Sequence, residues 1–307
     1  MLRIILLLIG VALSIFQSYN AILSVETQFL TFLFGILILG IPHGAADLLV
    51  ANENETAQKQ RFSTVFFLAN YVGRLLLFAV ILWFFPVMGN ILFIFLAAYH
   101  FGETDLHRFR TDTLAGKLLV ITYGLVILSI ILLPHYEEVK QIFMLFPSGA
   151  ANIDFINGIE THRQSIILAC FGLFFINIVN YYRKNKDLPI KEAARVLLQL
   201  LVILFIVYRL PMLLGFTFYF VFWHSILSLN NIVKYLKRNQ QNSYPIILKQ
   251  VFFYSSLAIV GIALFGFMGT MLISSTMITG YLFLGLAVLT APHMEVMHEM
   301  YKQLRSV

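Results

Sequence analysis

The sequence predicts an all-α fold: a polytopic membrane helical bundle of about ten transmembrane helices, in a single domain over residues 1–307. Its composition and the length of its apolar runs lead to this prediction. The chain is 60% hydrophobic and only 12% charged, which gives far more apolar surface than one soluble core can bury. The runs are mostly about 20 residues long, enough at roughly 1.5 Å per residue to cross a hydrocarbon layer of about 30 Å.

The apolar runs define the expected helices. They fall at roughly 4–24, 28–48, 64–85, 87–102, 114–133, 164–182, 193–209, 212–230, 246–271 and 277–296. The first run has no small-residue cleavage site and is followed directly by another spanning run, so it is expected to be a retained helix rather than a signal peptide. The longer connection at about 134–163 is expected to hold a short helix along the membrane interface.

The basic residues orient the bundle. When the runs are taken as spans, the 21 Lys and Arg residues fall on one side of the membrane, except for Arg74, Lys140, Arg163 and Arg209. The positive-inside rule then places both termini in the cytoplasm and the chain in the inner, cytoplasmic membrane as a multi-pass protein. The net charge of +6 marks this orientation. It favours contact with anionic lipid headgroups, and no nucleic acid partner is expected.

Four histidines share one kind of position. They lie near the cytoplasmic ends of the second, fourth, eighth and tenth runs: His43 in GIPHGAAD, His100 in AAYHFGETD, His224 in FWHSILSLNN and His293 in TAPHMEVMH. The topology came from Lys and Arg alone, so this coincidence of depth is an independent observation. Because lipid cannot satisfy an imidazole, these side chains are expected to face the bundle interior and to serve a function.

A transition metal is the ligand that this set of histidines favours. Neutral imidazoles without nearby thiolates suit iron, copper or zinc better than calcium or magnesium. A metal-bound imidazole usually donates its other N–H to a carboxylate, which fixes its tautomer. Asp47 follows His43 by four residues and so shares its helix face, which makes it the expected partner of His43; Glu103 and Glu295 stand within three residues of two other histidines.

Aromatic residues crowd two of these histidines. Most of the chain's aromatic side chains must face lipid or core, and only those beside the histidines are candidates for lining a ligand tunnel. These are Tyr99, Phe101, Tyr219, Phe220, Phe222 and Trp223.

The motif series resembles a known family. GIPHGAAD, YHFGETD, the WHS of the eighth run and the closing PHM resemble, in this order along the whole chain, the bacterial Brp/Blh family of β-carotene dioxygenases. The resemblance implies an integral-membrane, iron(II)-dependent enzyme. Such an enzyme cleaves β-carotene at its central double bond with O₂ and gives two molecules of retinal.

The resemblance also implies the iron ligands. His43, His100 and His224 match the iron-binding histidines of the family. The family usually places a further histidine one turn after the WHS histidine, and this chain has Ser228 there. We expect His293 to fill that place, rather than His298 on a different face of the helix, which makes four catalytic histidines.

The implied substrate gives roles to the neighbours of the histidines. Asp47 and Glu103 are expected to orient imidazoles, and Tyr99, Phe101, Tyr219, Phe220 and Trp223 to line an apolar tunnel for β-carotene. The partners are then β-carotene, O₂ and the lipid bilayer, and retinal could be delivered to a rhodopsin.

Two other classes of protein remain open from the residues alone. A membrane haem or metal electron-transfer protein would also place histidines in spans, as opposed pairs. A transporter would use the histidines with Asp47 and Glu103 as a polar path, although broken helices in matched halves are not evident. The HxxxH and HxxHH boxes of the desaturase and hydroxylase type do not occur.

Overall fold

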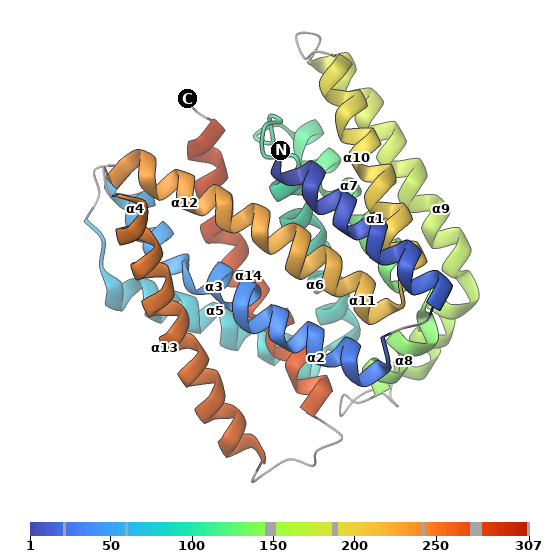
Figure 1. Ribbon diagram of the computed structural model, residues 1–307, viewed down its shortest axis with the longest axis horizontal. Helices are drawn as coiled ribbons and strands as arrows, with labels where there is room; N and C mark the ends of the chain where they lie inside the picture. Colours follow the sequence, from blue (N-terminus) through green and yellow to red (C-terminus); the bar gives the residue numbers. More distant parts are fainter. Residues whose placement is uncertain are drawn as a thin grey trace. The chain divides into compact units, whose positions relative to one another are not determined.

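The fold is helical throughout the part of the chain that the structure describes. The computed structural model describes residues 1–20, 23–58, 61–144, 152–185, 190–240, 243–270 and 278–305 (Figure 1). Within these ranges every long regular element is a helix, and two of them, η1 and η3, are π-helices.

The elements follow one another in this order: α1 (Leu2–Asn20), α2 (Val25–Gly35), η1 (Ile36–Gly40), α3 (Ile41–Ala45), α4 (Asp47–Ala57), α5 (Thr64–Phe84), α6 (Pro86–Asp105), α7 (Leu114–Leu132), α8 (Tyr136–Met144), α9 (Ile153–Lys184), α10 (Ile190–Arg209), α11 (Met212–Phe216), η3 (Thr217–Ser225), α12 (Ile226–Gln240), α13 (Tyr244–Thr270) and α14 (Ile278–Arg305).

Eight helical segments among the described residues are long and apolar enough to cross a membrane. They are Leu2–Tyr19, Val25–Ala57, Thr64–Phe84, Pro86–Asp105, Leu114–Leu132, Ile153–Lys184, Met212–Arg238 and Tyr244–Leu264. Within the described residues each run expected from the sequence is mostly helical, and α10 and α14 are the two expected spans outside this set of eight. The predicted polytopic helical fold is therefore confirmed, while the cytoplasmic placement of both termini stays a prediction.

The chain forms two compact units. The first unit consists of Met1–Ile36, Ala97–Lys140 and Asp154–Leu227, and the second of Leu37–Leu96, Gln141–Ile153 and Ser228–Val307. In the first unit α10 packs along α1 and also contacts α7 and α11 (Figure 1). In the second unit α14 packs on α4 and α5, and α13 packs on α3. The single domain over residues 1–307 stays a prediction.

The connection between α7 and α9 contains the expected short helix, α8. Lys140 on α8 donates a hydrogen bond to Glu160 on α9 at 2.9 Å, and the Tyr136 hydroxyl donates to the backbone oxygen of Ile156 at 2.6 Å. These contacts fasten α8 to the start of α9. The position of α8 at the membrane interface stays a prediction.

In the first unit, two glycines bring α6 and α7 into backbone contact. A Cβ atom on Gly102 of α6 would collide with the carbonyl oxygen of Val120, and one on Gly124 of α7 would collide with that of Ala98. Small residues permit such close approach of membrane helices, where packing replaces the hydrophobic effect between them. The C-terminal half of α6, which carries His100, is therefore fixed against α7.

We expect Gly124→Val to destabilise the protein by about 1–3 kcal/mol, because the added methyl groups force α6 away from α7. The measurement is the unfolding of the detergent-solubilised chain by heat or denaturant. Gly172→Val on α9 is the matched control, since a Cβ atom there meets nothing within 4 Å. Equal stability of the two variants would contradict this packing.

Candidate metal-binding site

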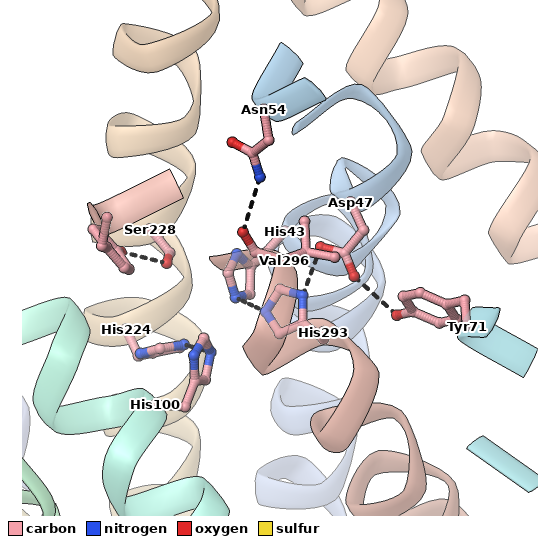
Figure 2. Close-up of polar contacts among 10 residues, drawn as sticks. His43, Asp47, Asn54, Tyr71, His100, His224, Ser228, His293 and Val296 are labelled. Atoms are coloured by element: carbon pink, nitrogen blue, oxygen red, sulfur yellow. Dashed lines mark hydrogen bonds and ion pairs between the residues drawn. The ribbon is translucent and has the colours of Figure 1, made fainter. Parts of the chain in front are cut away.

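The first unit holds His100 against His224 (Figure 2). His100 lies one turn before the end of α6, and His224 lies within the π-helix η3. Their Nε2 atoms are 2.9 Å apart, and the two rings meet at 71° with centroids 4.5 Å apart. Both side chains are buried, with exposed fractions of 3% and 1%.

The second unit holds His43 against His293 in the same manner (Figure 2). His43 lies on α3 and His293 follows Pro292 inside α14. Their Nε2 atoms are 2.8 Å apart, and the rings meet at 88° with centroids 4.4 Å apart. These two residues are also buried. Each unit thus pairs two histidines that are more than a hundred residues apart in the sequence.

The geometry of each pair fits two neighbouring ligands of one metal ion. Two imidazole nitrogens that lie about 2.1 Å from an ion and at a right angle to each other are about 3.0 Å apart. The separations of 2.9 Å and 2.8 Å are close to this value. Buried histidines whose ring nitrogens lie this close together could hold a metal ion. Imidazole nitrogens suit iron, copper or zinc.

Asp47 orients one histidine of the second unit. Its Oδ1 atom lies 2.7 Å from Nδ1 of His293, and its Oδ2 atom accepts a hydrogen bond from the Tyr71 hydroxyl at 2.8 Å. Since a carboxylate only accepts hydrogen bonds, Nδ1 of His293 carries the proton. The lone pair is then on Nε2, the atom that faces His43. This carboxylate–histidine contact is the arrangement usual around metal ligands.

The contact between Asp47 and His293 was not the one expected from the sequence. The spacing of four residues suggested His43 as the partner of Asp47, on a continuous helix. In the structure α3 ends at Ala45, and Ala46 has the dihedral angles φ −73° and ψ −7° before α4 begins at Asp47. The interruption breaks the helical face that the spacing argument assumed.

The sequence analysis did not identify Tyr71 on α5, although its place in the run was a sign of a polar contact. Its hydroxyl group stands in a mostly apolar run, and Arg74 lies three residues further along the same helix. Arg74 forms an ion pair with Glu295 of α14, two residues after His293. Tyr71 and Arg74 thus contact partners on α4 and α14, as expected of polar groups inside a span.

Aromatic rings surround His224, as the sequence suggested. Phe101 lies with its ring centroid 4.9 Å from that of His224, and Phe220 stacks on His224 at 6.0 Å. Tyr219 contacts Phe101 at 5.1 Å. These rings leave His224 in apolar surroundings, and their role as the wall of a substrate tunnel stays a prediction.

The remaining predicted residues lie on α6 and η3. The Tyr99 hydroxyl donates to Oε1 of Glu103 at 3.4 Å, and Glu103 is fully buried. Trp223 is fully buried beside His224 and donates its indole N–H to Asp105, another residue that the sequence analysis missed.

The helices are irregular near His43, His224 and His293. His224 is inside the π-helix η3, and the π-helix η1 ends three residues before His43. Such wide turns often mark functional sites. Pro292 inside α14 also lacks the backbone N–H of a regular helix.

The fold and these pairs define a class: a polytopic membrane protein with buried histidines able to bind a metal. A comparison with protein families matches residues 34–301, which include all four histidines, to β-carotene 15,15'-dioxygenase. The chain therefore belongs to the β-carotene 15,15'-dioxygenase family, and it is a carotenoid-cleaving enzyme of that type. The resemblance noted from the motifs is confirmed.

A curated relative agrees with this family. The β-carotene 15,15'-dioxygenase of uncultured marine bacterium 66A03 is 22% identical over 260 residues, which cover 84% of this chain and 89% of that protein. No solved structure matches the chain significantly.

We expect Asp47→Asn to weaken metal binding roughly 10–100-fold, because the amide can present a donor instead of an acceptor to Nδ1 of His293. The measurement is the affinity of the purified, metal-free protein for cobalt(II), followed by absorbance. Glu55→Gln, which removes a carboxylate from the same helix, is the control. An unchanged affinity in Asp47→Asn would show that this carboxylate does not orient a ligand.

Proposed function

We propose that this protein is an iron(II)-dependent oxygenase that cleaves β-carotene at its central double bond with O₂ and releases two molecules of retinal. Two buried histidine pairs in a chain of this family carry the proposal. The Nε2 atoms of each pair face each other at a distance suited to adjacent metal ligands.

We further propose that His43, His100, His224 and His293 bind one and the same ion. A single pair offers only two ligands, fewer than the three or four that proteins use to retain a catalytic metal. Four nitrogen ligands suffice for stable binding and leave positions open on a six-coordinate ion. His293 is then the fourth ligand, in place of the histidine that the family usually has at the position of Ser228.

The reaction balances without any further reactant. Both atoms of O₂ enter the products, one at each carbon of the cleaved double bond, so no external electron or proton is consumed. Ferrous iron, when bound, supplies the redox activity that O₂ needs to react with a closed-shell alkene. The protein orients His293 through Asp47 and surrounds His224 with Phe101 and Phe220, which keep water away.

The membrane explains how such a substrate reaches the site. β-Carotene is a long hydrocarbon that partitions into the bilayer, so an enzyme built of spanning helices can take it from lipid. A polyene has no polar groups for recognition, and the position of cleavage must come from the shape of an apolar tunnel. We place the enzyme in the cytoplasmic membrane by its basic loops, and delivery of retinal to a rhodopsin is compatible with release into lipid.

The other two functions considered from the sequence fit the geometry less well. A haem between two imidazoles keeps their Nε2 atoms about 4 Å apart, since each lies about 2 Å from the metal. Separations of 2.8 Å and 2.9 Å leave no room for it. A transporter would find a polar chain in Tyr71, Asp47 and His293, and transport assays on proteoliposomes with the metal-depleted protein would reveal it.

One iron per chain is the expected content of protein purified without oxygen, as measured by elemental analysis. We expect His100→Ala and His43→Ala each to lose nearly all of it, because either change leaves an incomplete ligand set. His162→Ala on α9 is the control. Two irons per chain, with one retained in each variant, would show instead that each unit binds its own ion.

Expression in cells that make β-carotene should remove their colour and yield retinal, detected by chromatography. In ¹⁸O₂, with rapid reduction of the aldehydes to prevent exchange with water, the label should appear in both halves of the substrate. His224→Ala, which removes a proposed ligand, should leave the cells coloured. Intact β-carotene beside iron-loaded wild-type protein would refute the proposed substrate.

A further inference from the structure

Asp105, the last residue of α6, is a buried carboxylate that the proposed reaction does not use. Its exposed fraction is 4%. Oδ1 accepts a hydrogen bond from the indole N–H of Trp223 at 2.9 Å. Oδ2 accepts from the hydroxyl groups of Tyr123 at 3.0 Å and Tyr219 at 3.4 Å. Three neutral donors from two other helices thus converge on one acid.

Arg3 of α1 completes this cluster. Its guanidinium donates to the backbone oxygen of Asp105 at 3.1 Å and to Oε1 of Gln199 at 2.7 Å. It also lies 5.9 Å from the ring centroid of Trp223. The positive charge of Arg3 therefore lies close to Asp105 through a bond to its backbone oxygen. The carboxylate oxygens of Asp105 accept from Trp223 and the two tyrosines.

Helices α6 and η3, which Asp105 and Trp223 connect, also carry the histidine pair of this unit. Asp105 follows His100 by five residues on α6, and Trp223 immediately precedes His224 on η3. Two sets of contacts therefore join α6 to η3, one between the imidazoles and one between Asp105 and the donors of Trp223 and Tyr219. At about 1.5 Å per residue, they stand roughly 7.5 Å apart along α6.

The bridge to Asp105 spans a wide turn. Tyr219 and Trp223 are four residues apart within the π-helix, and both donate to the one carboxylate. π-Helices are rare and short, so tertiary contacts have to maintain them. A buried charge by itself is weak evidence for stability, because apolar packing of the same volume is often at least as stable. A geometric role accounts for the acid better.

We propose that Asp105 is a positioning residue for His224. Through Trp223 it holds the wide turn of η3 in the register that presents Nε2 of His224 to Nε2 of His100. The proposal rests on the proposed function in one respect, namely that His224 is a metal ligand.

The bridge is tested first in metal-free, detergent-solubilised full-length protein. Trp83 and Trp223 are the two tryptophans of the chain, so a Trp83→Phe background isolates Trp223. Ultraviolet resonance Raman spectra report hydrogen bonding of the indole N–H. We expect Asp105→Ala to shift that band toward the value of a weaker bond, and an unshifted band would overturn the proposal whether or not the protein binds a metal.

The consequence for the ligand is tested by cobalt(II) titration. We expect Asp105→Asn and Trp223→Phe each to weaken binding roughly 10–100-fold and to alter the visible spectrum of bound cobalt, with no further loss in the double variant. Tyr123→Phe removes a donor to the same carboxylate that comes from α7 and leaves both η3 donors in place, and we expect less than about a threefold effect. Equal losses in all three single variants would reduce Asp105 to a general structural role and overturn the proposal.

Failure of the proposed function gives a different result. In that case wild-type protein takes up no cobalt, or His100→Ala takes it up as well as wild type, while the Raman band still reports the contact between Asp105 and Trp223. Trp223→Phe keeps the proposal falsifiable if the changes at Asp105 prevent folding. A Trp223→Phe protein that binds cobalt with wild-type affinity and spectrum would refute it.

Discussion

The need to satisfy polar groups inside hydrocarbon governs this structure. Lipid offers no hydrogen bonds, so an imidazole or carboxylate in a spanning helix must find its partner on another helix of the protein. His43 meets His293, and His100 meets His224. Each contact brings together helices that are remote in sequence, and each at the same time creates a possible metal-binding geometry. The side chains that satisfy one another inside the spans are thus the same ones that we propose as metal ligands.

The buried acids Asp47 and Asp105 find their hydrogen-bond partners in different ways. Asp47 contacts a histidine directly and leaves its Nε2 lone pair available, which is the usual task of a carboxylate behind a metal ligand. Asp105 contacts no histidine ring in this way and collects the donors of Trp223 and two tyrosines instead. One acid contacts a proposed ligand itself, and the other contacts the helix that carries a proposed ligand.

An enzyme for a membrane-soluble polyene needs few polar residues, and the chain has few. Its substrate can be recognised only by shape, and the proposed reaction needs only O₂ besides the substrate. The rings of Phe101 and Phe220 beside His224 keep the remaining surface apolar.

Composition and pattern determined the helical membrane fold, the approximate spans and the histidines worth examining. These follow from the sequence because hydrocarbon thickness sets the length of a spanning helix, and because histidine is costly in lipid. Which of these polar side chains contact one another, in contrast, was decided by tertiary structure. Asp47 contacts His293 on α14 next to the helix interruption at Ala46, and Asp105 at the end of α6 contacts Trp223 on η3. Spacing along a chain describes neighbours on one regular helix, whereas these contacts depend on wide turns and on residues more than a hundred positions away.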